Sequence, residues 1–96
     1  MVLLEVMQVE KYHSYWFRDE KHHKNYKLQF QFYGIDDLQV GDTVVIDESL
    51  LDTSSENFVQ PYAFEIVKTA QDNIENSEYI AVKTQKGKFV LKRVYG

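Results

Sequence analysis

The chain has 96 residues, no cysteine and a formal net charge of −4. This length suits one compact core, so we expect a single β-barrel domain over residues 1–96. The absence of cysteine excludes disulfides, thiolate zinc sites and cysteine nucleophiles. Apolar residues make up 44% of the chain and aromatic residues 15%, which is typical of a folded protein rather than a disordered one.

The first residues, MVLLEVMQVEK, reach Glu5 at once and have no basic leader, which is unlike a signal peptide. No apolar run approaches the ~20 residues that a membrane helix needs. The sequence therefore predicts a cytoplasmic protein that has no membrane partner.

Charge is distributed unevenly along the chain. Residues 1–35 have a net charge of +1, residues 36–82 of −10 and residues 83–96 of +5. A protein that coats nucleic acid would be basic throughout. Any binding of anions must therefore use a local patch built from the two ends of the chain, with the acidic middle segment turned away.

Alternation of apolar and polar residues predicts three N-terminal strands, at residues 2–10, 15–20 and 26–33. The side chains expected to face inward are those of Val2, Leu4, Val6, Tyr15, Phe17, Tyr26, Leu28, Phe30 and Phe32. Those expected to face outward on the second and third strands are Trp16, Arg18, Lys27, Gln29 and Gln31. Short polar turns join the three strands, and Gly34 ends the third.

Gly41 and Asp42 form a predicted turn into a buried strand, TVVI, at residues 43–46. Ser49 is expected to cap one helical turn that places the next two leucines under the barrel. Residues 58–67 are predicted to form a strand that bends, or lies at an edge, at Pro61.

The last segment, EYIAVKTQKGKFVLKRVYG, predicts a β-hairpin. A turn at Lys86 and Gly87 would pair two residues of the first strand with two of the second. The expected pairs are Val82 with Leu91 and Thr84 with Phe89.

Together these elements predict an all-β fold, a small closed or partly open barrel that is OB-fold-like and has a C-terminal β-hairpin. An SH3-like barrel and a two-sheet sandwich remain alternatives. Around seven strands exceeds the five of a minimal OB-fold, so the last hairpin is expected to be an addition or an edge extension.

The segments YKLQFQFY, VGD, LL and PYAF contain a pattern of core and turn residues: Tyr26, Leu28, Phe30, Tyr33, Val40, Gly41, Asp42, Leu50 and Leu51. This pattern resembles that of small uncharacterised bacterial OB-like barrel proteins. The strand order is also similar to the OB-fold domains of translation initiation factor one and of ribosomal-type RNA-binding repeats. The resemblance covers residues 2–66, implies the fold and transfers no functional residue. Residues 47–60, where the resemblance places the loop between the fourth and fifth OB strands, are acidic. In nucleic-acid-binding OB domains this loop usually helps to grip the nucleic-acid strand.

The outer face of the second and third strands is the first candidate site. Trp16, Arg18 and Lys27 lie on neighbouring strands in the expected register. An aromatic ring can stack a base while cations follow the phosphates, which is how single-stranded nucleic acid is held. Lys86 and Lys88 of the last hairpin would extend this surface. The alternative interpretation is an ordinary solvated strand face.

The three histidines are the second candidate. His13 precedes the second predicted strand, whereas His22 and His23 follow it, so a strand of seven or eight residues holds them ~25 Å apart. They cannot meet in one zinc site, which needs three or four converging ligands. At most, His22 and His23 hold an adventitious metal with a neighbouring carboxylate. We expect no functional metal site and no cofactor.

Catalysis has little basis in the sequence. There is no GxSxG motif, and no glycine-rich loop precedes a helix to hold phosphate. The acids of residues 36–82 match no EF-hand spacing. The sequence therefore predicts a non-catalytic binding module for single-stranded nucleic acid. The alternative is a protein-interaction or structural module that uses the acidic middle segment or an edge strand.

Overall fold

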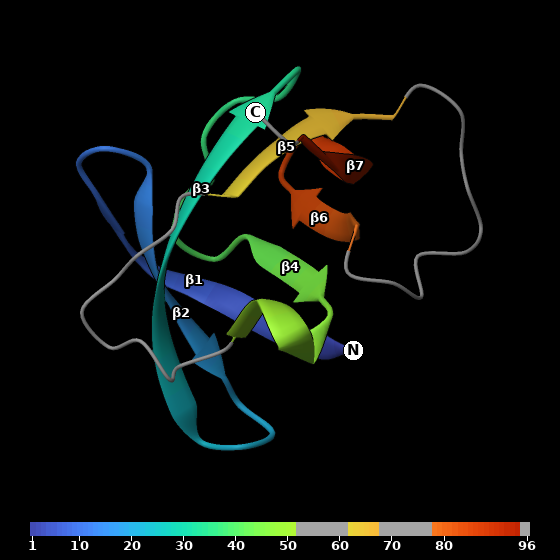
Figure 1. The fold of residues 1–96 in the computed structure, drawn as a ribbon. Helices are drawn as coiled ribbons and strands as arrows, with labels where there is room; N and C mark the ends of the chain where they lie inside the picture. The colour runs from blue at the N-terminus through green and yellow to red at the C-terminus, as the bar shows by residue number, and fades with distance from the viewer. Residues whose placement is uncertain (52–61, 68–77, 95–96) are drawn as a thin grey trace.

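The computed structural model describes residues 1–51, 62–67 and 78–94 (Figure 1). These residues form seven strands and one short 3₁₀ helix. The elements are β1 (Val2–Glu10), β2 (Ser14–Asp19), β3 (Lys24–Tyr33), β4 (Thr43–Ile46), η1 (Glu48–Leu51), β5 (Tyr62–Ile66), β6 (Tyr79–Thr84) and β7 (Gly87–Val94). Among the described residues, no helix has the length and apolar character needed to cross a membrane.

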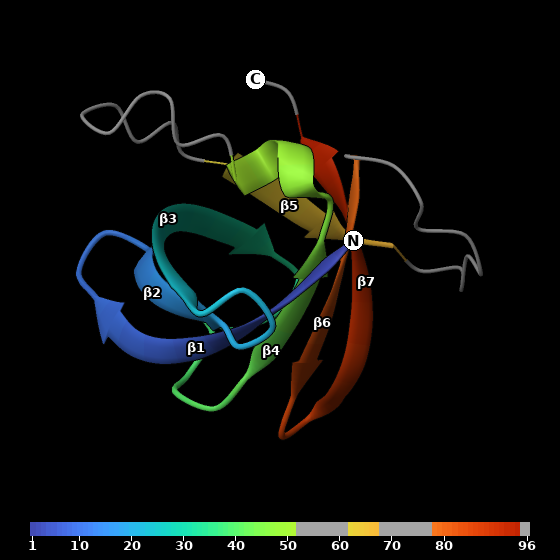
Figure 2. The same cartoon turned by 90° about the horizontal axis from the view of Figure 1, so that it is seen from below.

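The strands pair in a closed ring with the order β1-β2-β3-β5-β7-β6-β4 (Figure 2). β4 returns to β1 and completes the ring. Only the β3–β5 pair is parallel, and the other six pairs are antiparallel. The all-β, barrel-like fold predicted from the sequence is confirmed. The predicted C-terminal hairpin is present as β6–β7, and it lies within the ring between β5 and β4.

The core lies inside the ring and is rich in aromatic rings. Phe30 on β3 is fully buried. Its ring centroid lies 5.5 Å from that of Phe17 and 5.4 Å from that of Phe64. Offset and edge-on contacts of this kind add to the free energy gained by burying the rings. The predicted inward faces of the first three strands are confirmed, although Tyr26 and Leu28 are only partly buried at the margin of the core.

A β-bulge interrupts the pairing of β1 with β2 between Val6 and Gln8. Before the bulge, the even-numbered residues of β1 are buried; after it, Gln8 is exposed and Glu10 is half-buried. The extra residue places Gln8 opposite Trp16 of β2, whose side chain lies on the outer face. A bulge therefore moves the polar end of β1 from the core face to the surface.

The connection from β3 to β4 is bonded to β1 by backbone hydrogen bonds. The Val6 amide donates to the Asp42 carbonyl at 2.8 Å, and the Gly41 amide donates to the Val6 carbonyl at 2.9 Å. The Asp42 carboxylate accepts a hydrogen bond from the backbone amide of Gln39 at 2.8 Å, as expected for an aspartate in a turn. The predicted Gly41–Asp42 turn is thus confirmed, and it continues into β4.

Tyr15 holds the middle of the same connection from inside the barrel. Its ring is fully buried, and its hydroxyl oxygen accepts the Leu38 amide at 3.2 Å. Burial raises the pKa of the Tyr15 hydroxyl to about 12, a change that the Leu38 hydrogen bond only partly opposes. The tyrosine therefore stays neutral and fixes the connection to the core.

Two local predictions are wrong. In the hairpin, Val82 pairs with Phe89 and Thr84 pairs with Gly87, so the partners are two residues from those expected. Gln85 and Lys86 occupy the turn, and Gly87 begins β7 with a φ of +135°. At the helical turn, the Asp47 carboxylate accepts the Ser49 amide at 2.9 Å, so Asp47 makes the capping contact expected of Ser49.

Other element boundaries differ little from those predicted. The second strand begins at Ser14 and ends at Asp19. Leu50 is buried under the barrel, as expected, and Leu51 is partly buried. Residues 62–66 of the predicted strand at 58–67 are observed as β5, whereas residues 58–61, including Pro61, lie outside the described residues.

Candidate functional site

Trp16 and Lys27 of the predicted nucleic-acid face lie together on the outer surface. They are directly paired across β2 and β3. The Lys27 ammonium lies 5.8 Å from the centroid of the Trp16 ring, which is a cation–π distance. Glu10 binds both side chains, at 3.1 Å from Trp16 Nε1 and 3.1 Å from Lys27 Nζ. The hydrogen bonds from Lys27 and Trp16 hold the pKa of Glu10 below its ordinary value of 4.5.

Arg18 lies on the same outer face of β2, but it pairs with Asn25 rather than with a lysine. Its Nε donates to the Glu20 carboxylate at 3.1 Å. The two cations predicted for this face, Arg18 and Lys27, are therefore both matched by carboxylates. A phosphate would have to displace Glu10 or Glu20 to reach either of them.

Sequence reasoning missed the role of Glu10. An alternating strand that begins with Val2, Leu4 and Val6 inward would also bury Gln8 and Glu10. The signal in the sequence is that this alternation would place the Glu10 carboxylate in the core. A β-bulge, which exchanges the inward and outward faces of the strand, avoids that burial.

The hairpin lysines predicted to extend this face lie elsewhere. Arg18 on β2 and Lys88 on β7 are separated by four steps between neighbouring strands, through β1, β4 and β6. At the usual spacing of neighbouring strands this is about 19 Å along the curved sheet. Lys86 lies in the β6–β7 turn and forms an ion pair with Asp36. The structure therefore does not bring the five predicted residues together.

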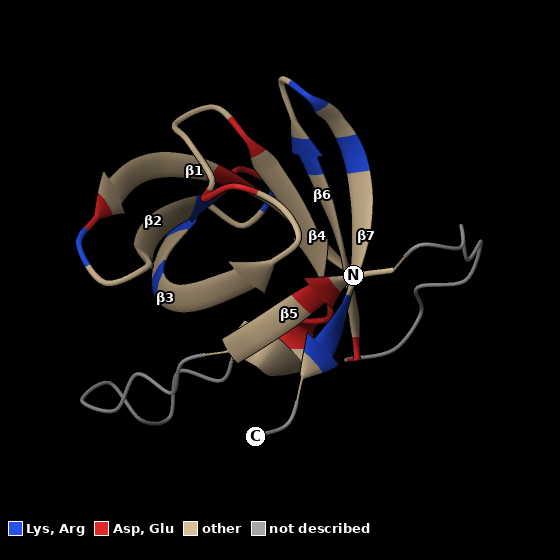
Figure 3. Ribbon diagram, turned by 90° about the horizontal axis from the view of Figure 1, so that it is seen from above, with Lys and Arg blue, Asp and Glu red and all other residues tan. Residues whose placement is uncertain are grey.

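The β6–β7 hairpin contains a different set of cations, coloured blue on its two strands in Figure 3. Lys83 and Lys88 are exposed and lie directly opposite each other. Within the described residues, neither lysine has a carboxylate partner at ion-pair distance. Further along the hairpin, Val90 lies opposite Ala81, and Lys92 lies opposite Tyr79. This hairpin face consists of Tyr79, Ala81, Lys83, Lys88, Val90 and Lys92.

The histidines are separated, as predicted. His13 Nδ1 lies 3.2 Å from the Asp37 carboxylate, and His22 Nδ1 lies 2.6 Å from that of Asp19. In the described parts of the chain, no three His, Asp or Glu side chains converge in a way that would hold a metal ion. Each of these two histidines therefore forms a local contact with one carboxylate.

Asp19 is a buried carboxylate with a structural role. Its side chain is 2% exposed and accepts the His22 amide at 3.3 Å in addition to the ring contact. Burial alone would raise the pKa of Asp19, but the hydrogen bonds and charge of His22 outweigh burial and hold the pKa below 3.8. The carboxylate therefore fastens the turn between β2 and β3.

This contact predicts a loss of stability in acid. Because the folded pKa of Asp19 is lowered, its contribution is complete above the unfolded pKa and is lost as the pH falls through the folded pKa. Urea unfolding as a function of pH should show a steeper acid decline for the parent than for Asp19→Asn. Glu20→Gln removes a neighbouring exposed charge and should keep the parent profile. Identical acid declines for the parent and Asp19→Asn would contradict this role.

Three aspartates of the acidic middle segment each contact another described residue of the chain. Asp36 pairs with Lys86, Asp37 with His13, and Asp42 accepts the Gln39 amide. The hydrogen bond and charge of Lys86 hold the pKa of Asp36 below 3.8.

Two cavities lie at opposite ends of β3. One, of about 460 Å³, is next to the β2–β3 turn and includes Asp19 and His22 in its wall. The other, of about 400 Å³, lies between the β3–β4 connection and the β6–β7 turn. No protein-family model, curated protein or solved structure matches the chain.

Proposed function

We propose that the protein is a non-catalytic binding module that binds single-stranded nucleic acid on the outer face of the β6–β7 hairpin. The observation that carries this proposal is the Lys83–Lys88 pair. Like charges placed directly opposite each other destabilise a sheet. A fold that keeps such a pair exposed, without a carboxylate partner among its described residues, presents a ready site for an external anion.

The rest of the hairpin face suits the same ligand. Tyr79 supplies an aromatic ring at the other end of the face, across from Lys92. Nonspecific single-strand binding combines stacking on such rings with cations that follow the backbone. By contrast, Arg18 and Lys27 on the β2–β3 face are already matched by carboxylates. The hairpin is therefore preferred over the face around Trp16.

Strand order also supports kinship with OB-type barrels. β1, β2 and β3 form an antiparallel meander, and β1 closes on β4. We propose that the barrel is an OB-like ring enlarged by the β6–β7 hairpin, since a minimal OB-fold has five strands and often binds oligonucleotides. The hairpin proposed to bind nucleic acid is thus the element that a minimal OB-fold lacks.

The proposal predicts that Lys83→Gln/Lys88→Gln weakens binding of a mixed-sequence single-stranded RNA by about tenfold or more at low salt. Two lost phosphate contacts should also reduce the slope of log affinity against log salt by about 1.4. Fluorescence anisotropy of a labelled RNA measures both quantities. Lys21→Gln/Lys24→Gln removes two exposed lysines, one in the β2–β3 turn and one at the start of β3, and should bind like the parent.

Failure of the parent to bind RNA at low salt would contradict the proposal. So would normal binding by the Lys83/Lys88 variant. Normal binding accompanied by quenching of Trp16 fluorescence would assign the site to the β2–β3 face instead.

An outer row of apolar side chains favours a second candidate function, a protein-interaction module. Leu3, Val45, Ala81 and Val90 are successive cross-strand neighbours on β1, β4, β6 and β7. Leu3 is 59% exposed. An edge strand is a weaker basis for this function, because each described strand pairs with two neighbours in the ring. This alternative expects no salt-dependent binding of RNA, so the same titration separates the two functions.

A further inference from the structure

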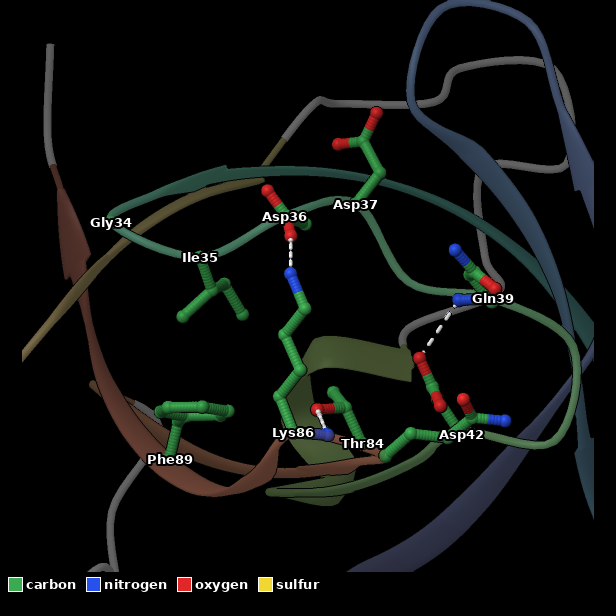
Figure 4. A pocket seen from close by; sticks show the side chains of 10 residues that line it. Gly34, Ile35, Asp36, Asp37, Gln39, Asp42, Thr84, Lys86 and Phe89 are labelled. Atoms are coloured by element: carbon green, nitrogen blue, oxygen red, sulfur yellow. Dashed lines mark hydrogen bonds and ion pairs between the residues drawn. The ribbon is translucent and has the colours of Figure 1, made fainter.

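The cavity between the β3–β4 connection and the β6–β7 turn has the size of a small-ligand site. Its volume is about 400 Å³, within the range typical of such pockets. The residues around it come from two segments far apart in the chain, residues 34–42 and 84–89 (Figure 4). None of them belongs to the outward-facing Lys83–Lys88 pair, so this site is separate from the proposed nucleic-acid face.

The two sides of the cavity differ in chemistry. Ile35 and Phe89 lie on one side and supply apolar surface, whereas Gln39 and Asp42 lie on the other (Figure 4). Three aspartates and one lysine contribute to the wall, so its formal charge is negative. A lining of this kind favours a ligand that combines a positive charge with an apolar body, and it disfavours an anion.

Lys86 shows where the cavity holds a positive charge, at the Asp36 carboxylate. The Lys86 side chain extends from the hairpin turn between the two sides of the cavity, and its ammonium binds Asp36 (Figure 4). Both side chains of this pair are 75% exposed. An exposed ion pair contributes little to stability, and a lysine side chain is long and flexible. Lys86 is therefore an occupant that another ammonium can replace at small cost.

We propose that this cavity binds a ligand with an ammonium group on an apolar stem, which replaces Lys86 at the Asp36 carboxylate and lays its stem against Ile35 and Phe89. The ligand's ammonium repeats the contact that Lys86 makes, and Lys86 turns to solvent. A free amine and a lysine side chain of another protein share this chemistry.

The test uses phenethylamine, with 2-phenylethanol as a neutral ligand of similar shape. Titrations followed by ¹H–¹⁵N NMR should move the amides of residues 34–37 and 84–89 with the amine. The alcohol should bind about two- to fivefold more weakly, because it cannot make the charged contact with the exposed Asp36 carboxylate. Asp36→Asn should reduce binding of the amine by a similar factor.

Lys86→Ala should strengthen binding of the amine about two- to fivefold, because the internal competitor is removed. Lys21→Ala is the matched control: it removes an exposed lysine that does not line the cavity, and it should leave amine binding unchanged. Retained dispersion of the NMR spectra verifies that each variant is folded.

Several results would overturn the proposal. The first is equal affinity for the amine and the alcohol. The second is an Asp36→Asn variant that binds the amine as tightly as the parent does. The third is a Lys86→Ala variant whose affinity rises by the same factor for both ligands. A parallel titration uses Nα-acetyl-lysine methylamide. Binding of this compound with the same dependence on Asp36 supports a protein lysine as the source, whereas binding of phenethylamine alone supports a free amine. Neither result depends on RNA binding, since Lys83 and Lys88 are intact in the Asp36 variant.

Discussion

Phe30→Ala is expected to lower the free energy of unfolding by about 3–5 kcal/mol, the range observed when a buried phenylalanine is truncated. The Phe30 ring lies at the centre of the aromatic core, with ring centroids of Phe17, Phe32, Tyr62 and Phe64 between 5.4 and 6.0 Å away. Truncation removes the buried area and leaves a cavity among rigid rings that cannot collapse to fill it. Urea denaturation of the parent and the variant measures the difference.

Tyr33→Ala provides the control on the same strand. Tyr33 is 49% exposed and lies outside the aromatic core. Its truncation should change the free energy of unfolding by about 0.5 kcal/mol or less, as is usual for surface positions. If Phe30→Ala and Tyr33→Ala had similar effects, the aromatic cluster would not be the centre of the core.

Gly34→Ala is expected to be the second strongly destabilising substitution. Gly34 has a φ of +98°, in a region that L-residues seldom adopt. A Cβ at this position would overlap Cγ2 of Ile66 and lie 3.1 Å from Cβ of Ile66. Backbone strain and steric overlap each cost about 1–3 kcal/mol, so we expect a total loss of about 2–6 kcal/mol in urea denaturation.

Gly41→Ala separates the two contributions. Gly41 has a nearly equal φ of +95°, but no atom lies within 4 Å of its added Cβ. This control should therefore show the cost of strain alone. In the Gly34→Ala background, Ile66→Ala should restore part of the lost stability, because it removes the overlapping methyl group. Equal losses for the two glycine variants would show that Ile66 does not restrict the end of β3.

The alternation of apolar residues was sufficient to predict which faces of the strands are buried. Tyr15 and Phe17, and likewise Phe30 and Phe32, lie at every second position and are buried as expected. This pattern succeeds because one face of each strand packs inside the ring while the other meets solvent.

The same pattern could not determine the register of the hairpin. A shift of two residues leaves every side chain on the same face, so Val82 is buried whether it pairs with Leu91 or with Phe89. The sequence predicts Gly87 as a central residue of the turn. Its positive φ instead occurs at the first position of β7, after a turn formed by Gln85 and Lys86.

The candidate site was only partly predictable, because its charges pair across long stretches of sequence. Trp16 beside Lys27 follows from the register of one hairpin. By contrast, the Lys86–Asp36 pair joins residues 50 positions apart, and Glu10 reaches Lys27 only because a bulge turns it outward. A list of charged residues does not show which of them are already neutralised by neighbours on other strands.

The place of the β6–β7 hairpin in the ring also affects how the nascent chain is protected during translation. Before this hairpin is made, β4 and β5 each lack one of their two neighbours. At 5–20 residues per second, the roughly 30 residues from the end of β5 to the end of β7 take about 1–6 s to synthesise. A chain that folds as far as β5 within that interval would have two open strand edges, which are sites of aggregation. The last described strands of the chain thus cover the free edges of both β4 and β5.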